Sequence, residues 1–472
     1  MEGIKRRAKI RVPARASIWY IVSSAFAKSV GVVGTPIFTR LLSPAEYGVY
    51  PHYTTWFSLF AAIATLELSG SVIYRGLQQF SYKKAGFISA ATGLSLCSII
   101  VFSLLYFTFS AIFGNFTGFG AGMMSLMLIH ITLNSIVNIY TAGCRYEYKY
   151  KSVALSGGLV ALCTPVLSFL LIRGLGFGGV GRVLSAAVVT GSVAIFFLYR
   201  IISHSRGLYN REIWRYLLKT AFPLLPHYVS TALILRIGEI VLRRAHGNEA
   251  LAKYSVAMSV GLSLTVITNG ILSALAPWML RKIKSGELSV ARELLYSSLK
   301  GLSLICLLIL TVVPETIGII APAAYSDALV AVYPLALSVI PMFLSGAVVS
   351  CEAYFERGAA TSLPSLVTAA LTLISTVIVI PRVDFRFSAL FLLLSYLSLA
   401  GLNILLFRRL SGENPIPIRR SVALFLFTLV YAVGLLLLRE SLVPRLLFAL
   451  PLIPALIGVA REVLPIIREK NT

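Results

Sequence analysis

The sequence predicts an all-α polytopic membrane protein with about 14 transmembrane helices. Hydrophobic residues make up 57% of the 472 residues and charged residues only 13%, a composition that is typical of membrane proteins. The apolar residues gather in runs near the length of about 20 residues that a helix needs to cross a bilayer. Helices are expected because they satisfy the backbone polar groups of a single run in lipid.

The apolar runs are joined by short connections, so no soluble domain is expected between them. The longest polar interruptions, 200–219 and 281–292, are too short to fold alone. We place the spans at 17–38, 49–73, 85–109, 117–141, 152–172, 180–200, 220–242, 251–275, 296–314, 328–350, 361–380, 387–407, 421–438 and 445–464.

The distribution of Lys and Arg predicts the orientation of these spans. With the N-terminus inside, the inner segments hold 30 Lys and Arg residues and the outer loops hold 10. Inner loops of membrane proteins carry such an excess of positive charge. The bias indicates an even number of spans, with both termini in the cytoplasm.

A weak internal repeat predicts the domain organisation. A shift of 204 residues along the sequence aligns Arg40 with Arg244 and Tyr50 with Tyr254. In both copies, the loop at this place joins an odd-numbered span to an even-numbered one. Many transporters consist of such repeated halves. We expect two pseudo-symmetric six-helix lobes and a C-terminal helix pair: a basic cytoplasmic N-terminus at 1–16, an N-terminal lobe at 17–204, a C-terminal lobe at 205–407, and a linker with two accessory helices at 408–472.

Composition and motifs argue against several function classes. The net charge of +24 is assigned to basic loops that face anionic lipid heads, not to nucleic-acid binding. The five cysteines are scattered along the apolar runs and suggest neither disulfides nor a metal site. No phosphate-binding G-x-x-x-x-G-K-[ST] loop occurs, so ATP hydrolysis by this chain is not expected. We predict that the chain is not an enzyme and binds no metal.

Two charges inside the first two spans are candidates for a path through the membrane. Lys28 lies in the first span, on a face with Ser24, and Glu67 lies in the second, one helical turn before Ser71. A charge at the bilayer centre costs roughly 2.5–3.5 kcal/mol on insertion scales, so it usually has a partner or a wet cavity. Lys28 would either face a substrate cavity or form a structural ion pair with Glu67 or another acid.

Polar residues in spans four and seven are further candidates for lining a cavity. In span four, Asn134 and Asn138 share a helical face, where hydrogen bonds between helices are the alternative role. Span seven carries His227 beyond two prolines that predict a kink. Its Arg236 and Glu239 are three residues apart, so a local salt bridge is the plain alternative to substrate binding.

Charged residues beyond the spans suggest gates. Arg40 and Glu46 in the first outer loop, with Arg244 in its counterpart, would form an outer gate. Glu352 and Arg357 would form an inner latch. For both sets the alternative is that the charges are only solvated.

The segment after the first span resembles a known family. Gly34-Thr-Pro-Ile-Phe-Thr-Arg-Leu-Leu-Ser-Pro-Ala-Glu-Tyr-Gly48 is similar to the corresponding stretch of the polysaccharide transporter family. These are O-antigen-type flippases of the multidrug/oligosaccharidyl-lipid/polysaccharide exporter superfamily. The rest of the chain matches by its span count, its inner termini and its two lobes.

The resemblance implies a flippase for surface polysaccharide such as lipopolysaccharide O-antigen. It would carry an undecaprenyl-pyrophosphate-type oligosaccharide across the plasma membrane (the bacterial inner membrane) by alternating access of two lobes around a central cavity. Basic groups in spans one and seven are typical of the family, and Lys28 and Arg236 match those places. A cation-coupled multidrug exporter and a membrane glycan polymerase or ligase remain the alternatives.

The same resemblance sets expectations about cofactors and partners. We expect no diffusible cofactor. Because the inward and outward states must differ in their affinity for some ligand, our own hypothesis is a coupling ion, a proton or sodium ion, at Glu67 or Glu239. The expected partners are the lipid-linked oligosaccharide and membrane lipids, with polysaccharide polymerase and export proteins as further candidates.

Overall fold

The computed structural model describes residues 2–205, 207–352 and 362–468, and within these ranges all regular secondary structure is helical. The chain forms two compact units, Met1–Ala232 and Leu233–Thr472. The boundary between the units falls inside one long helix, α10. It lies 28 residues beyond the predicted division at 204.

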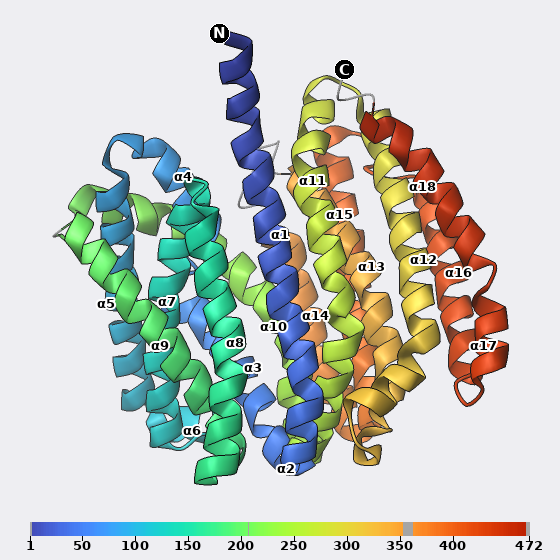
Figure 1. The fold of residues 1–472 in the computed structure, drawn as a ribbon, viewed down its shortest axis with the longest axis horizontal. Helices are drawn as coiled ribbons and strands as arrows, with labels where there is room; N and C mark the ends of the chain where they lie inside the picture. The colour runs from blue at the N-terminus through green and yellow to red at the C-terminus, as the bar shows by residue number, and fades with distance from the viewer. Residues whose placement is uncertain (1, 206, 353–361, 469–472) are drawn as a thin grey trace. The chain divides into compact units, whose positions relative to one another are not determined.

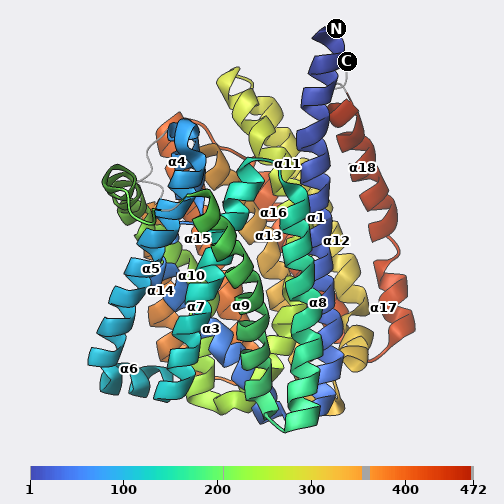
Figure 2. The same ribbon diagram turned by 60° about the vertical axis from the view of Figure 1, so that its left-hand side comes forward.

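The first unit is a bundle in which α7 and α9 form the centre (Figures 1 and 2). Helix α9 packs against α8 and α7, α5 packs against α7, and α1 runs along α8. The unit contains α1 (Glu2–Leu41), α2 (Pro44–Tyr47), α3 (Val49–Ala64), α4 (Ser71–Gln79), α5 (Lys84–Thr108), α6 (Ser110–Thr117), α7 (Ala121–Tyr146), α8 (Tyr150–Leu175), α9 (Gly178–His204) and the first part of α10 (Arg211–Gly261).

The second unit is organised around α13, which packs against α15, α11 and α12. Helices α16 and α18 lie along α12 (Figure 1). Beyond the end of α10, the unit contains α11 (Thr265–Lys284), α12 (Leu288–Ile320), α13 (Ala328–Glu352), α14 (Leu363–Val379), α15 (Ser388–Ser411), α16 (Ile418–Leu437), α17 (Leu442–Ala449) and α18 (Leu452–Arg468).

The sequence of α13 explains its central place. The helix is apolar on all sides, and 78% of its most apolar stretch is buried, compared with 22% for α16. A helix that is hydrophobic all round can face other helices on every side. Because lipid is as apolar as leucine, close packing and hydrogen bonds hold such helices together. Asn403 of α15 donates one such bond to Ser345 of α13, with 2.8 Å between Nδ2 and Oγ.

The predicted fold class is confirmed, whereas several span boundaries are wrong. Among the described residues, 11 helical segments are long and apolar enough to cross a membrane, and the count of 14 stays a prediction. The span predicted at 49–73 is not one helix, because residues 65–70 form turns between α3 and α4. The predicted loop between spans seven and eight is helical except at Gly247, whose φ is 81°. The last predicted span is divided into α17 and α18.

Candidate functional site

The break in the second predicted span is the most unusual local structure among the candidate residues. Leu66 and Glu67 have positive φ angles of 53° and 44°, which are uncommon for residues other than glycine. The amide of Gly70 closes the turn by donating to the Glu67 carbonyl at 3.0 Å. The prediction that Glu67 lies on a continuous helix is therefore wrong. Strained, non-helical backbone of this kind clusters at functional sites.

A tyrosine of α10 holds the far side of this break. The hydroxyl of Tyr228 lies 2.7 Å from Ser71 Oγ and accepts a hydrogen bond from the Ser71 amide at 3.2 Å. That amide opens α4, where the first turn of a helix leaves its N–H groups without a helical partner. A Cβ atom on Gly70 would lie 3.1 Å from the same hydroxyl. Tyr228 thus caps α4 and fits closely against the glycine beside it.

Lys28 and Glu67 lie on different parts of the first unit. Lys28 is exposed on α1, which packs along α8, whereas Glu67 is half-buried in the break. Ser24 lies one turn before Lys28 on the backbone of α1. The role of Lys28, in a substrate cavity or in a structural ion pair with Glu67 or another acid, stays a prediction.

The polar residues of span four divide between two environments. Asn138 is exposed, and its Nδ2 donates to Asn134 Oδ1 at 2.6 Å. His130, two turns away on α7, is buried and bonds through Nδ1 to the Tyr53 hydroxyl at 3.0 Å. His130 is thus part of the packing between α3 and α7. The asparagine pair presents amide groups on the accessible side of α7.

The residues predicted in span seven lie on α10. The salt bridge alternative is confirmed, because Arg236 Nη1 lies 2.8 Å from Glu239 Oε1. Glu239 is only 3% exposed and the Arg236 side chain 25%. His227 is half-buried and stacks edge-on against Tyr228. Pro223 and Pro226 lie inside the helix without ending it.

The outer-loop residues Arg40 and Glu46 have local structural partners. Arg40 Nη1 donates to the Pro36 carbonyl at 2.9 Å. Glu46 forms a capping box with Ser43 at the start of α2, in which each side chain accepts a hydrogen bond from the other residue's amide. A Cβ atom on Gly179 would lie 2.1 Å from the Glu46 carbonyl. This loop is therefore packed closely against the start of α9.

The same loop packs against Arg182 of α9, which the count of Lys and Arg residues places among the ten of the outer loops. The guanidinium carbon of Arg182 lies 4.7 Å from the ring centres of Phe38 and Tyr47 and 4.3 Å from that of Tyr50. Cations at such distances are attracted to aromatic faces. Phe38 and Tyr47 belong to the segment 34–48, and Tyr50 follows it by two residues. The segment thus binds the first helices of the unit to α9.

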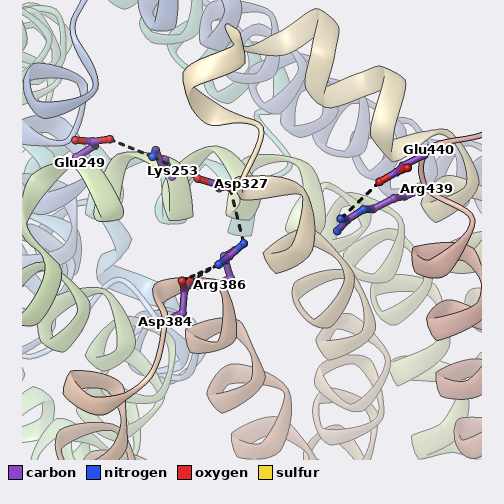
Figure 3. Close-up of polar contacts among 7 residues, drawn as sticks. All are labelled: Glu249, Lys253, Asp327, Asp384, Arg386, Arg439 and Glu440. Carbon is purple, nitrogen blue, oxygen red and sulfur yellow. Dashed lines mark hydrogen bonds and ion pairs between the residues drawn. The ribbon is translucent and has the colours of Figure 1, made fainter.

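Charged residues also gather at the loops of the second unit. Lys253 lies 3.0 Å from Glu249 and 3.6 Å from Asp327, and Arg386 joins Asp327 to Asp384 (Figure 3). A separate contact joins Arg439 and Glu440 at 4.0 Å (Figure 3). These ion pairs link the end of α10 to the loops before α13 and α15. Arg244, the predicted gate residue, lies on α10 five residues before Glu249, and its side chain is exposed.

The predicted inner latch is described only in part. Glu352 is the last residue of α13, and Arg357 lies outside the described residues.

One buried arginine was missed by the sequence interpretation. Arg445 of α17 is completely buried, forms an ion pair with Glu315 of α12, and donates to the Arg439 carbonyl at 2.8 Å. The count of Lys and Arg residues places it among the ten of the outer loops. Its signal was the apolar sequence on both sides of it, which favours burial with a partner.

Comparisons with known proteins place this arrangement in a family. The model of a family described as polysaccharide biosynthesis protein matches residues 14–282, which is more than half of the chain. The chain belongs to the polysaccharide biosynthesis protein family. A search of curated proteins gives no match.

Solved structures share the fold of this family member. The inward closed conformation of the lipid II flippase MurJ matches with a TM-score of 0.70 and 13% identity, covering 95% of this chain and 99% of that one. An inward-facing multidrug resistance MATE transporter of the MOP superfamily matches with a TM-score of 0.64 and 14% identity, over 85% and 95%. Its outward-facing counterpart gives 0.61 and 15%, over 87% and 96%. At these identities the likeness shows the fold.

The chemistry available at the candidate residues is binding and proton exchange. Lys28 offers a charged donor, the asparagine pair offers amide groups, and Glu67 offers a carboxylate beside a non-helical turn. Basic side chains form charge-assisted hydrogen bonds with phosphate oxygens. Within the described residues, no group of three or more His, Cys, Asp or Glu residues has the arrangement of a metal site.

Proposed function

We propose that this family member is a flippase for a lipid-linked oligosaccharide of the undecaprenyl-pyrophosphate type, used in the synthesis of a surface polysaccharide such as the O-antigen of lipopolysaccharide. The observation that carries the proposal is the family match across residues 14–282. The MurJ-like fold supports it, because that relative is named as a lipid II flippase. The protein would act in the bacterial inner membrane with both termini in the cytoplasm.

The physical problem that such a protein solves is the passage of a polar head through lipid. Sugar hydroxyls and pyrophosphate charges would lose their water in hydrocarbon at a high free-energy cost. A path lined by polar and cationic groups replaces that water, while the prenyl tail stays in the bilayer. In the proposal, Lys28 meets the pyrophosphate and the asparagine pair at Asn134 and Asn138 meets sugar hydroxyls.

Transport in one direction requires a ligand that binds the two access states with different affinity. We assign this role to a proton or sodium ion at Glu67. The alternative carboxylate, Glu239, is buried and already bridged to Arg236. Glu67 is more accessible, and a change in its charge would act directly on the strained turn that joins α3 to α4.

A reconstituted assay tests the proposal. The purified protein is reconstituted into vesicles that contain a fluorescent undecaprenyl-pyrophosphate oligosaccharide. A glycosidase that cannot cross the membrane is added outside, and the amount of glycan that it cleaves measures delivery to the outer leaflet. We expect delivery with the natural protein and its loss with Lys28→Ala. Lys83→Ala, which removes an exposed lysine before α5, is the matched control and should deliver normally.

Other outcomes would favour the other functions. Equal delivery by Lys28→Ala and the natural protein would remove Lys28 from the mechanism. Ion-driven efflux of cationic dyes without glycan delivery would identify a multidrug exporter. Longer glycan chains made by the purified protein would identify a polymerase, and in that case polysaccharide polymerase would not be a separate partner.

A further inference from the structure

A basic pocket lies at one end of the first unit. It has a volume of about 410 Å³ and is bounded by the start of α5, the end of α7, the start of α8 and the end of α9. These ends carry segments that the charge distribution assigns to the cytoplasm. Lys84, Lys149, Arg200 and His204 line the pocket, and Glu147 is its carboxylate.

The charges in this pocket are unequally compensated. Lys149 lies 2.6 Å from Glu147, so these two residues neutralise each other. Lys84 and Arg200 form no ion pair with a carboxylate among the described residues, and each lies against an aromatic ring instead: Lys84 5.4 Å from the centre of Tyr146, and Arg200 5.3 Å from that of Phe196. The pocket therefore keeps two positive charges available to an anion.

An apolar groove continues from this pocket along α8 and α9. The groove has a volume of about 330 Å³ and shares Ser152 and Phe196 with the basic pocket. Leu155, Leu159 and Val193 are among the residues that line it. From Ser152 to Cys163, its last lining residue on α8, the groove spans about 16 Å at the helical rise of 1.5 Å per residue.

The length and exposure of the groove match one leaflet of a membrane. About 16 Å is close to half of the roughly 30 Å hydrocarbon core of a bilayer. Leu155, Leu159 and Phe196 are 67%, 46% and 53% exposed, so a hydrocarbon chain can reach the groove directly from the bilayer. The polar end and the apolar end thus correspond to the two parts of a single lipid molecule.

We propose that the pocket and groove form a binding site for an anionic phospholipid of the inner leaflet, with its phosphate between Lys84 and Arg200 and one acyl chain along α8 and α9. Basic pockets between helices on the cytoplasmic side bind anionic head groups in this way. A prenyl chain of a transported substrate would be far longer than the groove, which favours a resident phospholipid.

Native mass spectrometry of the purified full-length protein tests the head-group contact. The protein is offered equal amounts of phosphatidylglycerol and phosphatidylcholine, and the bound lipids are counted. We expect the natural protein to retain phosphatidylglycerol preferentially, and K84Q/R200Q to retain it about 30-fold less because two surface charges are lost. Arg145→Gln, which removes a neighbouring exposed charge outside the pocket, should keep the preference. An unchanged preference in K84Q/R200Q would overturn the proposal, as would an equal loss in Arg145→Gln.

A second variant tests the groove and does not depend on the charges. Leu159→Trp fills the groove at a position that is already half-exposed, so the fold should tolerate it. We expect Leu159→Trp to lower phosphatidylglycerol retention by the natural protein. Added to K84Q/R200Q, it should cause no further loss of retention. Displacement of the lipid by inorganic phosphate alone would show that the groove has no role. Displacement by undecaprenyl pyrophosphate at much lower concentration than by phosphatidylglycerol would assign the site to the transported substrate. Either result would overturn the proposal.

Discussion

The burial of the Arg236–Glu239 ion pair on α10 predicts how much folding stability is lost when either partner is removed, and which loss is larger. Breaking a buried pair by removing one partner costs about 3–5 kcal/mol, because the other charge is left without compensation. The two partners are not equally buried: Glu239 is 3% exposed and the Arg236 side chain 25%. Arg236→Gln leaves the more deeply buried charge behind, so we expect it to cost the full amount. Glu239→Gln leaves the less deeply buried guanidinium, and we expect a smaller cost of about 1–3 kcal/mol.

Thermal unfolding in detergent, followed by intrinsic fluorescence, measures this difference. For a unit of this size each kcal/mol lowers the midpoint by about 2–4 °C, so a cost of about 3–5 kcal/mol means that Arg236→Gln should lower it by about 6–20 °C. The double variant R236M/E239L is the matched control, because replacing both charges by apolar residues of similar size is often neutral. A larger loss for Glu239→Gln than for Arg236→Gln would refute the reasoning, and so would a double variant that is less stable than either single one.

Three further predictions concern the break, the first outer loop and the loops of the second unit. Tyr228→Phe removes the hydroxyl that bonds Ser71 and should cost about 0.5–1.5 kcal/mol per hydrogen bond, measured as a lower unfolding midpoint and a slower glycan delivery. Gly179→Ala places a Cβ atom 2.1 Å from the Glu46 carbonyl, so the backbone must shift, and we expect a marked loss of folded protein on size-exclusion chromatography. Asp384→Asn should lower the unfolding midpoint at pH 7, by an amount that shrinks as the pH falls below about 3.9.

Each of these predictions has a control or a result that contradicts it. Gly174→Ala on α8 has no atom within 4 Å of the added Cβ and should be tolerated, so an equal loss in both glycine variants would contradict the packing argument. Normal delivery by Tyr228→Phe would separate the cap on α4 from transport.

The pH dependence at Asp384 follows from the sign of its shift. Hydrogen bonds from the Arg386 guanidinium, and from its amide, lower the pKa of the Asp384 carboxyl. A carboxyl with a lowered pKa in the folded state contributes stability above its unfolded pKa of about 3.9, and the contribution is lost as the pH falls through the folded value. A difference between the natural protein and Asp384→Asn that persisted unchanged to pH 3 would contradict this account.

The sequence was sufficient to predict the helices because hydropathy and helix length determine them directly. It could not predict the break at 65–70, since the segment Thr-Leu-Glu-Leu-Ser-Gly contains no proline and continues the apolar run. The one tertiary contact described beside this break comes from Tyr228, which is 157 residues away from Ser71 in the sequence. The turn at Gly247 is different, because the sequence predicted a loop at this place. What it did not predict is that the residues on both sides of Gly247 are helical.

The candidate residues show the same limit. The spacing of Arg236 and Glu239 was enough to predict their salt bridge, because both lie on one helix. The aromatic partners of Arg182 come from α1, α2 and α3, so no local pattern could identify them. Glu46 was assigned to a gate from its charge, although the capping-box spacing from Ser43 was present in the sequence. The roles of Lys28, Asn134 and Asn138 in transport stay predictions.

The position of the unit boundary has a mechanical consequence. Residues 232 and 233 lie inside α10, so the covalent connection between the units is a helix and not a slack coil. Pro223 and Pro226 lie within three turns of the boundary, and each removes a backbone hydrogen bond from the helix. Elastic strain in this connection would therefore concentrate at the two prolines.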